Sequence, residues 1–86
     1  MEEFCVVRCE VADDVVVAAE ILHASATNSR SDAEAAAEAA AKAHQTFGFD
    51  ATDGYWWGKN TGSVTNRFIP TTLVDGHRLV EELSSS

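Results

Sequence analysis

The N-terminal segment alternates between two sets of side chains with a period of two. One set is Cys5, Val7, Cys9 and Val11, and the other is Phe4, Val6, Arg8 and Glu10. Successive side chains of a strand point to opposite faces of a sheet, so this pattern predicts a strand over residues 4–11. We expect the face that carries the two cysteines to be buried.

A second strand is predicted over residues 15–25, after a turn at Ala12-Asp13-Asp14. The β-branched cluster at its start and the short turn favour a strand that pairs with the first as a hairpin. A helix is the alternative, because some apolar positions of this segment also follow a helical stripe. In the strand, Glu20 should avoid the core, which directs the other set inward: Val15, Val17, Ala19 and Ile21.

The main helix is predicted over residues 31–47. Ser31 and Glu34 have the spacing of a capping box, in which each side chain accepts from the backbone N–H of the other residue. Gly48 fits the left-handed position after the helix. One stripe is rich in alanine and ends at Phe47, so the helix can lie close to a sheet, while Glu34, Glu38 and Lys42 follow the solvent side at four-residue steps.

A second hairpin is predicted after the turn at Asp53-Gly54. Residues 55–59 and 63–69 read as strands joined across residues 60–62, and Pro70 should close the last one. We expect Trp56 to face Arg67 in a cation–π contact, and Tyr55 to face Phe68. A slip of one residue would exchange the two faces. Adjacent tryptophans must point to opposite sides in either register.

A short amphipathic helix is predicted from about Asp75 to Leu83, weakened by Gly76 near its start. The fold class is therefore α+β, in the order ββαββ(α). Two hairpins form a four-stranded, mainly antiparallel sheet with the main helix on one face. The other face would carry Phe4, Val6, Val16, Ala18, Leu22 and Trp56. Either the C-terminal helix or another polypeptide should cover this apolar set.

Length and composition place the chain among small globular domains. With 86 residues, 45% hydrophobic and 23% charged, it should form one domain over residues 1–86, with a frayed tail at 84–86. No apolar stretch approaches the roughly 18 residues that cross a bilayer, and the start lacks the positive region of a secretory signal. We expect a cytoplasmic protein.

Acidic side chains outnumber basic ones by 14 to 6, which gives a formal charge of −8. Nucleic acids and anionic membranes both attract lysine and arginine, so we expect direct binding to neither. A small acidic domain instead suits a protein partner with a basic surface, because long-range attraction accelerates their encounter. Solubility alone is the alternative explanation of the charge.

Catalytic and metal sites are not favoured by the residues that could form them. On one strand, Cys5 and Cys9 would lie about 13 Å apart, beyond the reach of a disulfide, and burial would raise their pKa values. Zinc would also need His23, His44 or His77, whose spacing is not that of a zinc site. Residues 50–54 lack the full calcium-loop pattern. We expect no enzyme activity, no metal and no other cofactor.

The favoured function is a non-enzymatic interaction module. Arginine and aromatic side chains often dominate binding energy, so Trp56 and Arg67 are the candidate apolar and cationic contacts. The candidate acidic contacts are Asp13, Asp14, Glu20, Glu34 and Glu38.

In size, acidity and α+β make-up, the chain resembles the small phage-encoded inhibitors of nucleic-acid machinery, such as anti-CRISPR proteins. The resemblance is one of composition and covers no motif. It implies an inhibitor that occupies a basic nucleic-acid-binding surface of its partner. The alternatives are a bacterial homodimer of unknown function, joined through the sheet face, and a metal- or thiol-dependent enzyme.

Overall fold

The structure, a computed structural model, describes residues 2–84, apart from the side chains of residues 23–25 and 84. Its elements are β1 (Phe4–Ala12), β2 (Val15–Thr27), α1 (Arg30–Lys42), β3 (Thr46–Asp50), β4 (Tyr55–Lys59), β5 (Val64–Thr72) and α2 (Leu73–Ser84). The α+β class is confirmed. The four-stranded ββαββ(α) arrangement is wrong by one strand, because β3 was not predicted. Of the predicted frayed tail, residue 84 ends α2 and residues 85–86 lie outside the described residues.

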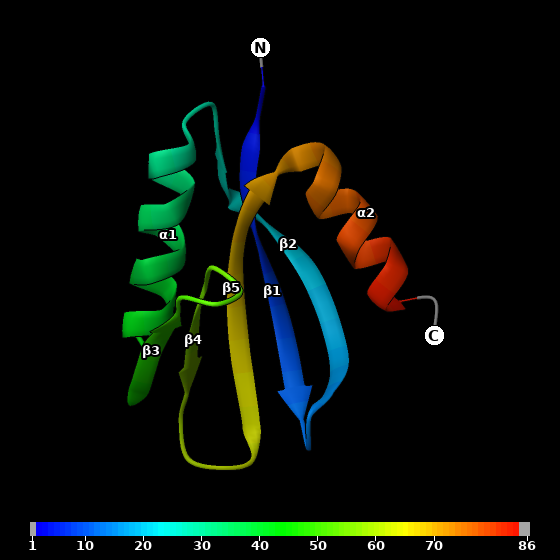
Figure 1. The fold of residues 1–86 in the computed structure, drawn as a ribbon. Helices are drawn as coiled ribbons and strands as arrows, with labels where there is room; N and C mark the ends of the chain where they lie inside the picture. The colour runs from blue at the N-terminus through cyan, green and yellow to red at the C-terminus, as the bar shows by residue number, and fades with distance from the viewer. Residues whose placement is uncertain (1, 85–86) are drawn as a thin grey trace.

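The five strands form one sheet in the order β2-β1-β5-β4-β3, in which each neighbouring pair is antiparallel. Figure 1 shows α1 (green) and α2 (orange to red) on opposite sides of this sheet. The interior strand β1 is therefore covered on both faces and paired along both edges. This position explains why both of its alternating sets contain apolar side chains, since a strand buried on two faces needs two apolar faces.

Each helix covers the opposite face from the one expected. On one face, Ala37 and Ala41 of α1 pack on Val6 and Phe68 of the sheet. On the other face, Leu79 and Leu83 of α2 pack on sheet residues Cys5, Val7, Cys9 and Ile69. The apolar set that includes Phe4, Val6, Leu22 and Trp56 is thus the face that the main helix covers. The alanine stripe of α1 suits this face, because small side chains let the helix approach the large Phe68 and Trp56 rings.

The predicted hairpin of β1 and β2 is confirmed, but part of the inward face of β2 is wrong. Glu10 pairs with Ala18 while Val11 pairs with Val16, so a bulge at Val17 changes the alternation. As a result, Val15 and Val17 are 60% and 58% exposed, and Val16 packs under α2 in their place, together with Ala19 and Ile21.

The main helix begins and ends earlier than predicted. Ser29, and not Ser31, is the N-cap, and its Oγ accepts from the N–H of Asp32 at 3.4 Å. The helix ends at Lys42 because the following residues pair with β4. The side chain of Asn60 accepts the N–H of Gln45, and Thr46 pairs with Lys59.

Gly48 lies within β3 and does not cap the helix. The Trp57 ring lies over it so closely that a Cβ at Gly48 would be 2.7 Å from Cζ2 of Trp57. Phe47, predicted to end the helix stripe, is likewise a β3 residue and is exposed.

The second hairpin is confirmed with a register one residue away from the predicted one. Trp56 pairs with Phe68, and Trp57 pairs with Arg67. The two tryptophans do point to opposite sides, but Trp56 lies on the α1 face and Arg67 on the α2 face. The expected Trp56–Arg67 contact is therefore wrong, and the guanidinium of Arg67 lies over Tyr55, 5.2 Å from the ring centroid.

Pro70 does not close β5, which continues to Thr72 and leads directly into α2. Pro70 lies opposite Val6 of β1 and beyond the last pair with β4, so the strand continues through it where β5 no longer pairs with β4. The helix starts two residues before the predicted Asp75, because the Thr72 Oγ1 accepts the N–H of Asp75 at 3.1 Å as an N-terminal cap.

Candidate functional site

A hollow of about 510 Å³ lies between α1 and the strands that curl beneath it. We call it the Trp56 hollow. Its main lining residues are Glu34, Ala35 and Glu38 from α1 and Phe49, Trp56 and Pro70 from the sheet. The α1 residues are brought together because positions one turn apart share a face of a helix. The sheet residues are brought together because Phe49 and Trp56 are directly opposite on β3 and β4.

The wall of the Trp56 hollow is aromatic and its rim is acidic. The rings of Phe49 and Trp56 are 5.2 Å apart between centroids and tilted by 54°. Phe49 is 51% exposed, so much of the apolar surface of its ring is open to solvent. Glu34 and Glu38 place two carboxyl groups along the helix side of this opening.

A cation from the chain itself lies beside this hollow. The Nζ of Lys42 lies 5.6 Å from the centroid of the Trp56 ring and 3.0 Å from Oε2 of Glu38. Within the residues that the structure describes, no salt bridge to Glu34 is present. The site therefore combines an aromatic face with a carboxylate, that of Glu34, which makes no salt bridge among the described residues.

A second hollow, of about 310 Å³, lies on the opposite face of the sheet, beside the β1–β2 turn. Residues on several strands and the β1–β2 turn line it: Val11, Asp13, Asp14, Tyr55, Trp57 and Arg67. The turn meets the β4–β5 loop because Ala12 pairs with Val64. Both aspartates have positive φ angles, 52° and 64°, as a two-residue hairpin turn of type I′ requires.

Charges are mixed around this second hollow. Backbone N–H groups of Asp53 and Thr52 donate to the carboxylate of Asp50, and they hold its pKa below the usual range. Burial raises the pKa of the neighbouring Tyr55, against the opposing effect of Arg67. The surroundings of this hollow therefore combine carboxylates, a guanidinium and a phenol, whereas the charged residues that line the Trp56 hollow are both glutamates.

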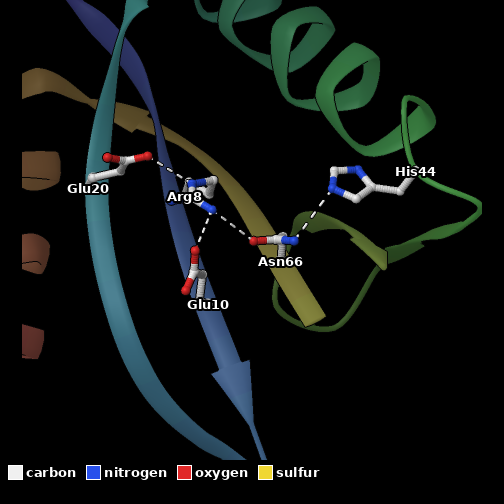
Figure 2. A network of polar contacts seen from close by, with 5 residues as sticks. All are labelled: Arg8, Glu10, Glu20, His44 and Asn66. Atoms are coloured by element: carbon white, nitrogen blue, oxygen red, sulfur yellow. Dashed lines mark hydrogen bonds and ion pairs between the residues drawn. The ribbon is translucent and has the colours of Figure 1, made fainter. Parts of the chain in front are cut away.

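A polar network occupies the sheet beyond the C-terminal end of α1 (Figure 2). Arg8 donates to Glu20 at 2.8 Å, to Glu10 at 2.7 Å and to Asn66 at 3.1 Å. Burial opposes the charge of Arg8, but the hydrogen bonds with Glu10 and Glu20 outweigh it and raise its pKa. The network extends to His44, whose Nε2 lies 3.4 Å from Nδ2 of Asn66. The Glu20 carboxylate is thus paired with Arg8 of the same chain, which makes Glu20 a weaker candidate for contact with a partner.

The cysteines lie in the core under α2. Cys5 and Cys9 are free, 0% and 2% exposed, and burial raises the pKa of each thiol. Both properties disfavour a nucleophile, which needs access and a low thiol pKa. Among the described residues, no three His, Cys, Asp or Glu side chains are grouped as a metal site would need, and the side chain of His23 lies outside that set.

The seven candidate contact residues fall into three places. Trp56, Glu34 and Glu38 meet at the Trp56 hollow, while Asp13, Asp14 and Arg67 meet at the second hollow. Glu20 lies apart, in the Arg8 network. Sequence reasoning missed Phe49, Lys42 and Trp57 as site residues. The alternation of residues 46–50 was a signal for Phe49, but the adjacent alanine-rich helix hid it.

Neither helix of the described chain is long and apolar enough to cross a membrane. No protein-family model matches this chain, and neither a curated protein nor a solved structure matches it.

Proposed function

We propose that the chain is a non-enzymatic, acidic interaction module that binds a basic surface of a partner protein. In the more specific form of this proposal, it is a cytoplasmic inhibitor that occupies the nucleic-acid-binding surface of that partner, as phage-encoded anti-CRISPR proteins do. One observation carries the proposal. Glu34, Glu38 and Trp56 line a single hollow, with the open ring of Phe49 beside them.

Three properties of the molecule support this choice over an enzyme. The thiols are buried, with raised pKa values, and the Trp56 hollow is lined by glutamates and aromatic rings. The Ser31 hydroxyl in this lining bonds to the Ser29 hydroxyl at 3.0 Å, and no histidine stands among the lining residues to activate it. The net charge of −8 favours a cationic partner. The exposed aromatic surface supplies apolar contact, which gives an interface affinity beyond long-range attraction.

The test is to capture the partner from the native host and then measure competition. We expect the retained protein to be basic, to elute between about 50 and about 500 mM salt because screening weakens the attraction, and to release its nucleic acid when the chain binds. The variant Glu34→Gln with Glu38→Gln should lose most of this binding.

The matched control is Glu81→Gln with Asp75→Asn, which removes the same charge from α2. Equal losses in both variants would show that only overall charge matters and would refute a localised contact. Retention that is as strong at high salt as at low salt, or nucleic acid that stays bound to the partner, would refute the basic-surface inhibitor.

A homodimer is the second candidate, and one observation favours it. The helix α2 packs on β2, β1 and β5 without reaching β4 or β3. The half-buried Tyr55 and Trp57 on that side are therefore not covered by α2, and a second copy would cover them. Sedimentation at micromolar concentration separates the candidates, because a monomer argues against the dimer and a dimer that Trp57→Ala dissociates supports it.

A further inference from the structure

The Trp56 hollow has a chemical preference that the position of Lys42 reveals. The Lys42 ammonium lies near the Trp56 ring and bonds to Glu38, so this aromatic face and this carboxylate together already accommodate a cation. Lys42 is at the C-terminal end of the hollow and does not line it, whereas Glu34 does. The volume of about 510 Å³ leaves room for a second, larger cationic group beside Glu34.

We propose that the hollow receives an arginine side chain of the partner protein. The guanidinium would lie on the face of Trp56 and donate to the carboxylates of Glu34 and Glu38. This proposal rests on the proposed function and names the group by which the partner is recognised.

The charges on the rim call for one further cation. The lining holds two carboxylates, Glu34 and Glu38, and no cation. Lys42 lies beside the hollow and bonds to Glu38, while Arg30, one helical turn before Glu34, lies over the ring of Phe4. In the part of the chain that the structure describes, Glu34 therefore makes no salt bridge. An arginine that enters would pair with it. Its apolar stem would lie against Phe49 and Pro70, as long basic side chains lie along apolar surface with the charged end on polar groups.

The geometry favours arginine over lysine. Residues four apart on a helix have Cβ atoms about 6 Å apart. The carboxylates of Glu34 and Glu38 are therefore close enough for one guanidinium to donate to both. A planar guanidinium can stack on an indole while it donates in two directions, whereas an ammonium is a compact point charge. Lys42 already provides Glu38 with a compact positive charge, so a second ammonium would repeat a contact that is already made.

The experiment uses three short synthetic peptides that differ at one central residue, arginine, lysine or the neutral isostere citrulline, in an otherwise uncharged sequence. Binding is followed by NMR through the indole N–H signals of the two tryptophans. We expect the Trp56 signal to shift with the arginine peptide, while that of Trp57, on the opposite face, stays in place. The arginine peptide should bind about tenfold more tightly than the citrulline peptide and about threefold more tightly than the lysine peptide.

Two pairs of variants locate the contact. Glu34→Gln should weaken binding of the arginine peptide about three- to tenfold, against little change in Glu81→Gln. Lys42→Gln should strengthen it about threefold, because the internal competitor for Glu38 and the Trp56 face is gone. Lys59→Gln is its control, since it removes the same charge from the end of β4, and circular dichroism confirms that each variant is folded.

Three results would overturn this inference. They are equal shifts with arginine and citrulline, a lysine peptide that binds as tightly as the arginine peptide, or equal gains in Lys42→Gln and Lys59→Gln. If one of these occurs while a basic partner is still retained in a salt-sensitive manner, the contact lies elsewhere on the acidic surface and the proposed function stands. If no basic partner is retained, the proposed function fails whatever the peptides do.

Discussion

Gly76 and Cys5 touch where α2 crosses β1. A Cβ placed on Gly76 would be 2.7 Å from the Sγ of Cys5 and 3.4 Å from Cγ2 of Val7. From the sequence, this glycine only weakens a helix. In the structure, the absence of a side chain is what lets α2 lie directly on the cysteine face. The role of a glycine in a close approach depends on its neighbours across the core, which local sequence does not contain.

We therefore expect Gly76→Ala to destabilise the protein. In an open helix the same change stabilises by about 1 kcal/mol, because alanine has the higher helix propensity. Here the new methyl group must displace Cys5 or the helix, so the free energy of unfolding should fall by about 1–3 kcal/mol. Urea unfolding followed by circular dichroism measures the change.

A second variant shows whether the contact with Cys5 is the cause. In a Cys5→Ala background the Sγ is absent, so Gly76→Ala should become neutral or stabilising. A loss of the same size in both backgrounds would contradict the contact and place the cost in the backbone of α2.

At the scale of the elements, the sequence predicts those with a regular pattern and clear ends. Both N-terminal strands, the hairpin of β4 and β5, and α2 are found within a few residues of their predicted limits. The exception is β3, whose alternation at Thr46–Asp50 directly follows the alanine-rich helix without a proline between them. Its pairing with β4 is a long-range contact, and this pairing overrides the helical pattern that reaches Phe47.

The register of β4 and β5 was beyond prediction for a related reason. The loop between Lys59 and Val64 fits more than one pairing, and a slip by one residue exchanges the faces of every side chain. The observed pairing brings Trp56 under α1, where it meets Glu34 and Glu38. The sequence therefore predicted that Trp56, Glu34 and Glu38 are candidate contact residues, but not that they line the same hollow.

The start of α1 gives the prediction at this scale. Ser29 precedes α1, whereas Ser31 is its second residue, and of these two hydroxyls that of Ser29 accepts from a backbone N–H of the first turn. Ser29→Ala should therefore lower the free energy of unfolding by about 1 kcal/mol. Ser31→Ala removes the exposed hydrogen bond of 3.0 Å between the Ser31 and Ser29 hydroxyls but leaves the bond to the backbone in place, so it should change the free energy of unfolding by less than about 0.5 kcal/mol. The urea midpoints of the two variants measure these losses. A larger loss of stability in Ser31→Ala than in Ser29→Ala would show that Ser31 is the N-cap.

At the scale of the whole molecule, both faces of the sheet are apolar. The sequence pattern therefore does not show which helix covers which face. The Phe4–Val6 set and the Cys5–Val7 set are equally suited to a helix, and only three-dimensional packing distinguishes them. As a consequence, the apolar face expected to be bare is covered by α1. The uncovered part lies on the α2 face of β4, around Tyr55 and Trp57, because α2 packs on β2, β1 and β5.

The acidic surface has a stability cost that is visible at the β1–β2 turn. Asp13 and Asp14 both have positive φ, a conformation that Asn-Gly adopts with less strain. Each aspartate also adds a negative charge to a chain that already has a net charge of −8. Replacement of both by the favoured turn residues should therefore stabilise the protein in two separable ways, through the backbone and through reduced repulsion.

We expect the variant Asp13→Asn with Asp14→Gly to raise the free energy of unfolding by about 1–2 kcal/mol at low salt. Urea unfolding at about 20 and about 500 mM NaCl separates the two contributions, since salt screens the repulsion and leaves the backbone gain unchanged. The variant Glu2→Gln with Glu81→Gln removes two charges without any change in a turn, so its gain measures repulsion alone. If the turn variant gains no more than this control, positive φ costs the aspartates nothing. If it is less stable than the natural chain at both salt concentrations, the two carboxylates hold the turn through contacts of their own, and the acidic surface at that end has a structural origin.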